Sequence, residues 1–468
     1  MATESDLQEF VAAAAQELDV PGVSVGIHAD GQDHFAYHGV TSIENPLEVD
    51  ENTIFQFGST GKTFTATAIM RLVDQGRVDL DAPVRRYVPE LALKDPDVAG
   101  QVTVLHLLNH TAGWAGDLLD NTGDGDDAIE KYVARMANLE QETPLGASVS
   151  YNNASLSLAG RIIEHVTGQV FQQAIKELLL EPLGLDNSYF FPNEVMTRRF
   201  AVGHTQKPDG TIVVARPWAL PRGAAPAGGI SSDSRDLMTW ARFHLGDGTA
   251  KDGTRVLAEE LLKRMQQPTA DMKGSALGDA VGLSWLLTDV DGVRLVAHGG
   301  TTNGQHSSFV LAPERGLAIS SMTNCGPNGP QFNERVEAWA LEVFAGVRKP
   351  QEEPMTLTDA ELAPFTGAYA TIAATVDIVE REGLLEAKVA IKPEVLEQLR
   401  EAGEATDMDS EQPPFVLGLL PGDGDRYVIT EGPAKGMKGY FVRDDAGRIT
   451  GVHLGGRLAS RQGADAAV

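Results

Sequence analysis

Cysteine is almost absent from this chain: Cys325 is the only one in 468 residues. No disulfide bond can therefore form within the chain, and the Cys and His clusters of a structural zinc site are missing. A His-Glu-x-x-His zinc motif is missing as well. We expect neither a metal nor another cofactor. Cys325 follows the stretch 319–323 and is predicted to be a buried thiol at the end of a strand.

Basic residues are few. Lys and Arg total 38 against 66 Asp and Glu, which gives a formal net charge of −28 at pH 7. Phosphate backbones and anionic lipid surfaces repel such a chain, so we expect neither a nucleic-acid partner nor a membrane partner. An acidic surface favours a cationic substrate such as a free amine. It also serves solubility, which is the more general explanation.

Long apolar runs are missing too. No stretch approaches the roughly 20 apolar residues that a membrane-spanning helix needs. Residues 1–6 do not form the basic segment with a following apolar core that marks a signal peptide. The expected location is cytoplasmic, with a leader removed earlier as the alternative.

The composition that remains is typical of a folded protein, with 42% hydrophobic and 22% charged residues. A chain of 468 residues is too long for one ordinary hydrophobic core, so two domains are expected. Residues 349–355 combine two prolines with charged side chains and are predicted to be a linker. The predicted domains are therefore residues 1–348 and residues 356–468.

The first domain is predicted to be α+β. A helix capped by Ser5 and two strands after Pro21-Gly22 are expected to join three strands within residues 293–324 in one antiparallel sheet. The sheet is expected to be flanked by helices, the last of them from about Asn333 to Phe344. The middle of the domain, roughly residues 60–290, is predicted to be a helical subdomain that forms the other side of a cleft.

Residues 356–468 alternate short apolar runs with turns, which predicts a second, antiparallel β-barrel domain. Asp445-Ala446-Gly447 is predicted to be the hairpin turn between the last two strands. No catalytic set of residues is found here. The expected roles are gating of the cleft, assembly of a homo-oligomer, or stabilisation. The predicted strands are Thr375–Val379, Pro414–Leu419, Arg426–Ile429, Tyr440–Val442 and Arg448–Leu454.

The segment Phe57-Gly58-Ser59-Thr60-Gly61-Lys62-Thr63 supports two interpretations. One is a phosphate-binding loop that ends in Gly-Lys-Thr. Such a loop needs a glycine five residues before Gly61, where this chain has Gln56, so the loop is too short to wrap phosphates. The segment is also not a nucleophile elbow, because Gly-x-Ser-x-Gly needs a glycine where Phe57 stands.

The other interpretation is a nucleophilic serine. Ser59 is expected at the first turn of a helix, which places Lys62 on the same face one turn later. The helix N-terminus favours negative charge on Ser59 Oγ and offers a backbone N–H to an oxyanion. A neutral lysine amine can take the hydroxyl proton. A single Ser-x-x-Lys is common on helix surfaces, so this interpretation depends on partners elsewhere.

Two distant segments supply such partners. Tyr151-Asn152-Asn153 precedes an amphipathic helix that ends at Gly168, which places a phenol and an amide at one wall of a cleft. His298-Gly299-Gly300-Thr301 follows a strand, and its glycines let a backbone approach a ligand closely. Taken singly, a helix-capping asparagine and a plain hairpin turn explain these segments better.

Taken in order, Ser-x-x-Lys, Tyr-x-Asn and His-x-Gly resemble the motifs of the serine β-lactamase and penicillin-binding-protein superfamily. The resemblance is closest to the class C β-lactamase, D-aminopeptidase and esterase branch. Segments 107–113, 181–185 and 226–232 also resemble segments of this superfamily. The resemblance covers the first predicted domain and implies the β-lactamase/transpeptidase-like fold. The C-terminal barrel resembles the lipocalin-like domains appended to some members.

The resemblance also implies catalytic roles. Ser59 is the acylated nucleophile. Lys62 and Tyr151 share proton transfer, and which of them is the primary base stays open. Asn153 holds Lys62 and the amide of the substrate.

Substrate binding is implied for the third motif. The N–H groups of Ser59 and Thr301 form the oxyanion hole, and His298, Gly299 and Gly300 line the strand beside the substrate. Many members have a lysine where this chain has His298, and that lysine suits a substrate carboxylate. Histidine is largely neutral near pH 7, which weakens carboxylate anchoring.

The sequence therefore predicts a serine hydrolase that forms an acyl-enzyme on Ser59. Its expected substrate is a small molecule or a short peptide with an amide bond of the D-amino-acid type or an ester bond. A carboxylesterase or a weak β-lactamase of the same fold is the alternative within this class. A non-catalytic, penicillin-binding-like scaffold is the alternative from another class.

Overall fold

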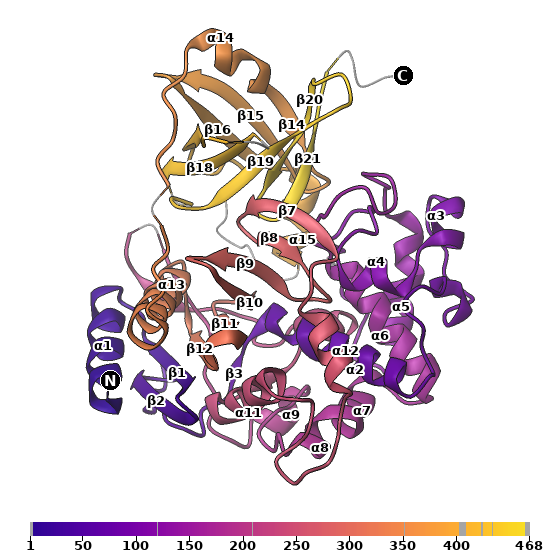
Figure 1. Ribbon diagram of the computed structural model, residues 1–468, viewed down its shortest axis with the longest axis vertical. Helices are drawn as coiled ribbons and strands as arrows, with labels where there is room; N and C mark the ends of the chain where they lie inside the picture. The colour runs from indigo at the N-terminus through magenta and orange to yellow at the C-terminus, as the bar shows by residue number, and fades with distance from the viewer. Residues whose placement is uncertain are drawn as a thin grey trace.

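The structure is a computed structural model that describes residues 3–118, 120–207, 209–350, 352–401, 409–422, 425–432 and 434–463. Figure 1 shows two parts: a sheet flanked by helices below, and a β-barrel above it built from the last quarter of the chain. Helices α2–α7 gather on one side of the lower part, and α1 and α13 lie on the other side. This is the predicted α+β arrangement with a second β domain.

An eight-stranded antiparallel sheet forms the centre of the lower part, in the order β2-β1-β12-β11-β10-β9-β8-β7. β1 pairs with both β2 and β12, so both ends of the first predicted domain contribute to one sheet, as expected. The strands are β1 Gly22–Ala29, β2 Gln32–Gly39, β7 Ala270–Ser275, β8 Gly278–Val281, β9 Leu286–Val290, β10 Val293–Thr301, β11 His306–Ala312 and β12 Leu317–Thr323.

The predicted helical subdomain was extended too far along the chain. Residues 270–290 are predicted to belong to it, but they form β7, β8 and β9, the last three strands at one end of the sheet. Short apolar runs between turns do not distinguish a strand from a buried helical segment by periodicity alone, and only the pairing with β10 decides the matter.

Helices α1 (Glu4–Glu17) and α13 (Asn328–Ala340) cover one face of the sheet. Phe10 of α1 stacks on Trp339 of α13 with ring centroids 4.9 Å apart. The cap of α1 is Thr3 and not Ser5 as predicted. Thr3 Oγ1 accepts from the N–H of Asp6, and the Asp6 carboxylate accepts from the N–H of Thr3, which closes a capping box.

The opposite face packs against a larger apolar core built around α2 (Lys62–Asp74), α6 (Asn153–Thr167) and α11 (Ser234–Leu245). Gly168 ends α6 in the left-handed conformation, as predicted. No helix in the described ranges combines the length and the apolar content that a membrane crossing needs. The other α-helices of this part are α3 Pro96–Gln101, α4 Val104–Leu108, α5 Ala128–Arg135, α7 Phe171–Ile175, α8 Glu181–Leu183, α9 Pro192–Val195, α10 Ala225–Gly228 and α12 Glu259–Met265.

Two small sheets complete the lower part. Their strands are β3 Phe55–Gln56 with β6 Ser231–Ser232, and β13 Cys325–Gly326 with β4 His204–Gln206 and β5 Ile212–Val214. Cys325 is fully buried at the start of β13, so the predicted buried thiol is confirmed.

The barrel is a closed ring of eight antiparallel strands. The hairpin turn at Asp445–Gly447 is confirmed, because the N–H of Gly447 donates to the carbonyl of Asp444 between β19 and β20. Three strands had not been foreseen: β14, β16 and β21. The elements are β14 Gly367–Ala370, β15 Ala374–Arg381, β16 Leu384–Ile391, β17 Phe415–Leu419, β18 Arg426–Glu431, β19 Lys438–Arg443, β20 Ile449–Leu454 and β21 Arg457–Arg461, with α14 Asp359–Leu362 and α15 Pro393–Glu401.

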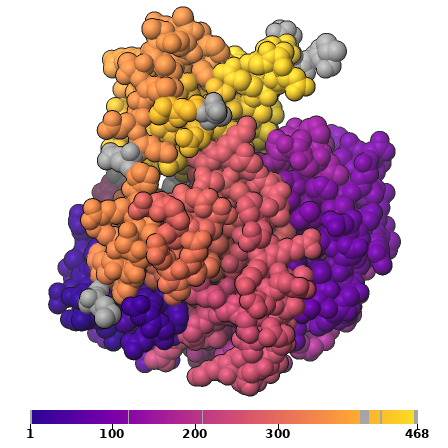
Figure 2. All heavy atoms as spheres, in the orientation of Figure 1, coloured from indigo at the N-terminus to yellow at the C-terminus, as the bar shows by residue number. Residues whose placement is uncertain are grey.

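The barrel rests directly on the lower part. Figure 2 shows its yellow surface against the pink surface that includes the β7–β8 hairpin. The N–H of Ala276, between β7 and β8, donates to the carbonyl of Lys438 on β19 at 2.8 Å. We propose residues 349–355 as the linker. Its Glu352 forms an ion pair with Lys438 at 2.9 Å, so this segment is itself held on the barrel.

Candidate active site

Ser59 lies in a 3-10 turn, Gly58–Gly61, that leads into α2, and Lys62 is the first residue of that helix. Lys62 Nζ lies 2.9 Å from Ser59 Oγ and donates to the carbonyl of Ala227 at 2.6 Å. The side chain of Lys62 is fully buried. The short turn thus aims the lysine amine at the serine hydroxyl, and the segment 226–232 supplies the carbonyl that fixes it.

Burial sets the protonation of Lys62. Desolvation lowers the pKa of its amine well below the usual value, the nearby charge of Arg457 lowers it further, and Asp117 opposes the shift. The two groups hydrogen-bonded to the amine are a hydroxyl and a carbonyl, neither of which is charged. The neutral amine that a proton acceptor requires is therefore favoured here.

Tyr151 packs against this pair. Its ring centroid is 4.9 Å from Lys62 Nζ and 4.7 Å from the centre of the His110 ring. Burial raises the pKa of the phenol above its ordinary value, while a hydrogen bond with Ser59 opposes the shift. Tyr151 therefore stays protonated near neutral pH and can donate its proton to a neighbouring atom.

Two glycines bring the end of β10 against the serine turn. A Cβ on Gly300 would lie 1.9 Å from the carbonyl oxygen of Phe57 and 2.7 Å from the amide nitrogen of Ser59. A Cβ on Gly58, whose φ is +56°, would lie 2.7 Å from the amide nitrogen of Thr301. The backbones of Ser59 and Thr301 therefore lie close together, as the predicted pair of oxyanion donors requires.

His298 lies on β10 and is 1% exposed. Its Nδ1 is 2.6 Å from the carbonyl oxygen of Gly299, and its Nε2 is buried without a hydrogen-bond partner among the described residues. Burial lowers the pKa of His298 to about 3, with a smaller contribution from Lys62. A neutral imidazole, and no fixed positive charge, therefore stands at this position of β10.

The two asparagines after Tyr151 have different partners. Asn152 caps α6: its Oδ1 accepts from the N–H of Ser155, and its Nδ2 donates to the carbonyl of Trp114. The prediction that Asn153 holds Lys62 is not what the structure has. Asn153 Nδ2 donates to Asp117 Oδ1 at 2.7 Å, and the carbonyl of Ala227 holds the lysine. The carboxylate is a charged acceptor and fixes the amide nitrogen, while the lysine, itself a donor, is held by a carbonyl nearer to it.

Sequence reasoning missed Asp117 and Arg457. The guanidinium of Arg457, the first residue of β21, pairs with Asp117 through Nε–Oδ2 at 2.6 Å and Nη2–Oδ1 at 2.9 Å. The centre of the guanidinium group is 5.1 Å from the Tyr151 ring centroid. No motif marks either residue, because they lie 340 positions apart and meet only when the barrel docks.

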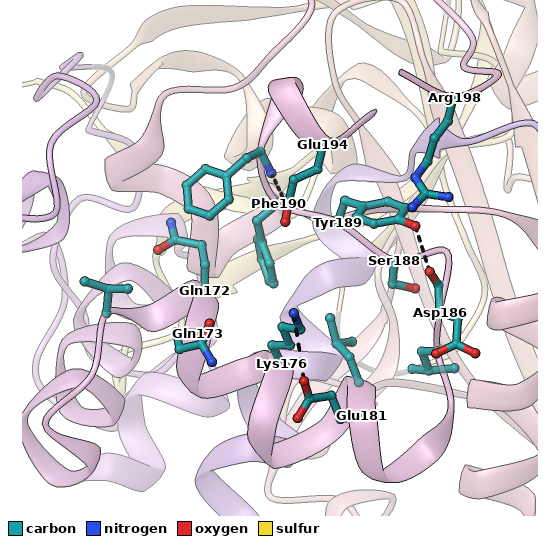
Figure 3. A pocket seen from close by; sticks show the side chains of 14 residues that line it. Gln172, Gln173, Lys176, Glu181, Asp186, Ser188, Tyr189, Phe190, Glu194 and Arg198 are labelled. Carbon is teal, nitrogen blue, oxygen red and sulfur yellow. Dashed lines mark hydrogen bonds and ion pairs between the residues drawn. The ribbon is translucent and has the colours of Figure 1, made fainter. Parts of the chain in front are cut away.

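A separate cavity of about 440 Å³ lies in the helical subdomain between α7 and α9, and none of the predicted catalytic residues lines it. Figure 3 shows Arg198 reaching over Tyr189 at one side and Gln172 and Phe190 at the other. Within the described ranges, no three His, Cys, Asp or Glu side chains gather in a way that could hold a metal ion.

The first domain matches a known family. The β-lactamase family profile covers residues 7–344, and the chain therefore belongs to the β-lactamase family. Its fold is the α+β fold of that family, with an eight-stranded barrel added at the C-terminal end.

Individual relatives agree with this assignment. Penicillin-binding protein 4 of Amycolatopsis lactamdurans is 35% identical over 367 residues, which cover 77% of this chain and 96% of the relative. The crystal structure of SurE is 25% identical, covers 98% of this chain and 99% of its own, and superposes with a TM-score of 0.77. The D-amino acid amidase of Ochrobactrum anthropi SV3 is 26% identical over 71% of this chain and 94% of its own, with a TM-score of 0.58.

Proposed function

We propose that this protein is a serine hydrolase that forms an acyl-enzyme on Ser59 and cleaves an amide or peptide bond of the D-amino-acid type, or an ester bond. The observation that carries the proposal is the fully buried lysine amine 2.9 Å from the serine hydroxyl. A buried lysine at this distance has no packing purpose that an apolar side chain would not serve better. It is suited to accept the hydroxyl proton.

In acylation, the neutral amine of Lys62 accepts the proton of Ser59 while Oγ attacks the carbonyl carbon of the substrate. Negative charge develops on the carbonyl oxygen, where the N–H groups of Ser59 and Thr301 stabilise it. The leaving nitrogen or oxygen takes a proton through the phenol of Tyr151. Lys62 is the primary base in this scheme, because burial lowers its pKa and raises that of Tyr151.

Deacylation repeats these steps with water. The proton of the attacking water passes to the same lysine and tyrosine pair, and Ser59 Oγ leaves as a hydroxyl. No step requires a charge on His298, whose neutral ring forms part of the wall beside the oxyanion hole.

The substrate preference rests on His298 and on the relatives. A neutral imidazole does not anchor a carboxylate, so penicillins and C-terminal carboxylates are expected to bind weakly. The similarity to a D-amino acid amidase supports an amide of a D-residue. We rank that activity level with ester hydrolysis and rank β-lactam hydrolysis lower.

Initial rates on three chromogenic substrates test the proposal: D-Ala-p-nitroanilide, p-nitrophenyl butyrate and nitrocefin. We expect turnover of at least one of the first two to exceed that of nitrocefin, and L-Ala-p-nitroanilide is the control for stereochemistry. An absence of turnover on the whole panel, together with no labelling of Ser59 by a fluorophosphonate, would favour a non-catalytic scaffold.

Exchanging His298 for lysine should restore carboxylate anchoring. His298→Lys is expected to bind penicillins at least about tenfold more tightly, because a charge-assisted hydrogen bond contributes roughly 1.5–3 kcal/mol. The measurement is the concentration of benzylpenicillin that halves the rate of p-nitrophenyl butyrate hydrolysis. His298→Gln, which stays neutral, is the matched control. Equal penicillin affinity in the two variants would contradict the argument.

The barrel also bears on assembly. A homo-oligomer formed through residues 356–468 stays a prediction, since the structure describes a single chain.

A further inference from the structure

The last hairpin of the barrel reaches into the candidate active site. Its turn, Gly455-Gly456, presents the carbonyl of Gly456 to the N–H of Tyr151 at 2.9 Å. The next residue but one, Leu458, donates its N–H to Ser150 Oγ at 3.4 Å. Hydrogen bonds from the barrel backbone therefore hold the irregular segment before α6 that carries the predicted catalytic tyrosine.

Arg457 adds a side-chain contact at the same place. Its two bonds to the oxygens of Asp117 fix both groups in one plane. Asp117 Oδ1 also accepts from Asn153 Nδ2, so one carboxylate joins the barrel to the Tyr-x-Asn motif. The side chains of Arg457 and Asp117 are 34% and 22% exposed, so the pair is partly buried.

Tyr151 is thereby held on three sides. Arg457 lies 5.1 Å from its ring centroid, Lys62 Nζ lies 4.9 Å from it, and the ring of His110 lies 4.7 Å away. Asp117 holds the Nε and Nη2 edge of this guanidinium. Removing either partner of the pair frees the tyrosine on the barrel side.

The pair also balances charge near Lys62. Arg457 lowers the pKa of Lys62 and Asp117 raises it. The other titratable groups beside the lysine are His110 and His298, whose pKa values burial lowers, and Tyr151, whose pKa burial raises; all three are neutral at pH 7. A carboxylate alone beside Lys62 would favour its protonated form, which cannot act as a base.

We propose that the barrel completes the active site by supplying Arg457, which acts with Asp117 as a positioning pair for Tyr151, Asn153 and Lys62. The proposal rests on the function proposed above. It assigns the C-terminal domain a role in the reaction of the first domain, where motifs alone find none.

Arg457→Gln and Asp117→Asn are expected to have opposite effects on the acid limb of the kcat/KM profile. In the first variant the unpaired Asp117 raises the pKa of Lys62, so the limb moves to higher pH. In the second the unpaired Arg457 lowers that pKa, so the limb moves to lower pH. Both variants are expected to lose about 10- to 100-fold in kcat at their own optimum, because the tyrosine loses its support. Arg457→Lys keeps the positive charge, so its acid limb is expected at the same pH as in the wild-type protein.

The chain offers a matched control. Arg443 of β19 pairs with both oxygens of Asp425 at 2.6 and 3.0 Å, and its guanidinium lies 5.3 Å from the Phe365 ring. Arg443→Gln thus breaks a pair of the same geometry elsewhere in the barrel. It is expected to change stability without moving the pH limb. If the acid limb of the kcat/KM profile lies at the same pH in Arg457→Gln, Asp117→Asn and Arg443→Gln, the proposal is overturned and Arg457 has a structural role alone.

A titration of Lys62 separates this proposal from the proposed function. The titration follows the side-chain ¹³Cε resonance of Lys62, assigned by its loss in Lys62→Met, in a Ser59→Ala background that has no turnover. Opposite shifts of its midpoint in Arg457→Gln and Asp117→Asn support the pair even if no substrate is found. If the titration midpoint of Lys62 is the same in both variants as in the Ser59→Ala background, the proposal of a positioning pair is overturned even if the enzyme is active.

Discussion

Ser59→Ala is expected to reduce turnover of any accepted substrate by about 10⁴-fold or more and to abolish labelling by a fluorophosphonate. Without Oγ no acyl-enzyme forms, and the remaining groups only bind the substrate. The loss should appear in kcat and not in KM, since the removed atom makes its decisive bond only during the reaction. Burst kinetics with p-nitrophenyl butyrate and intact mass after labelling are the measurements.

The control for this variant is Ser24→Ala. Ser24 is a buried serine on β1 whose hydroxyl has no hydrogen-bond partner among the described residues. Its replacement removes the same atom from a buried position on β1 and should leave turnover unchanged. If Ser59→Ala kept its turnover while labelling was lost, the acyl-enzyme mechanism would be wrong.

Lys62→Met is expected to lower kcat about 10²- to 10⁴-fold, the usual contribution of a general base, while the folded protein becomes no less stable. Methionine fills the same buried space and needs no proton acceptor beside it. The carbonyl of Ala227 loses its hydrogen-bond donor in this variant, which lowers the free energy of unfolding slightly and offsets part of the gain.

The stability effect has a defined pH dependence. The pKa of Lys62 is lower in the folded than in the unfolded chain, so the unfolded chain binds more protons between the two values. The lysine therefore destabilises the fold most below its folded pKa, and the cost disappears as pH rises through the unfolded pKa. Chemical denaturation should show the advantage of Lys62→Met growing as pH falls.

The exposed Lys131, which pairs with Asp127 at 2.8 Å, provides the matched control. Lys131→Met removes a lysine that water already solvates. This variant should therefore keep the wild-type kcat, and its free energy of unfolding should not show the pH dependence expected for Lys62→Met. Turnover retained in Lys62→Met would transfer the role of base to Tyr151, since the phenol is the other group within reach of the serine.

The local parts of the site could be predicted from the chain itself. Ser59 and Lys62 stand three residues apart at the start of a helix, and helical geometry places them on one face. The sharp turn that ends α6 follows from Gly168, because only glycine takes the left-handed conformation freely. These relations span a single turn of backbone and therefore follow from residue type and spacing.

Tyr151 and His298 could be assigned only because they occur in order with Ser59. Spacing does not show that Tyr151 and His298 lie with ring centroids 6.0 Å apart, nor that burial keeps His298 neutral. The partner of Asn153 was predicted incorrectly for the same reason, since no local rule points to Asp117. Burial and partners are properties of the packed molecule.

Residue types, their order and their spacing were enough to predict the family, to single out the Ser-x-x-Lys, Tyr-x-Asn and His-x-Gly motifs, and to divide the chain into an α+β part and a β-rich part. The extension of the sheet by residues 270–290 and the pairing of Arg457 with Asp117 became visible only in the folded molecule. The physical reason is the range of the interactions. Helix faces and turns depend on residues a few positions apart, whereas strand pairing and an ion pair across 340 positions exist only after the chain has folded.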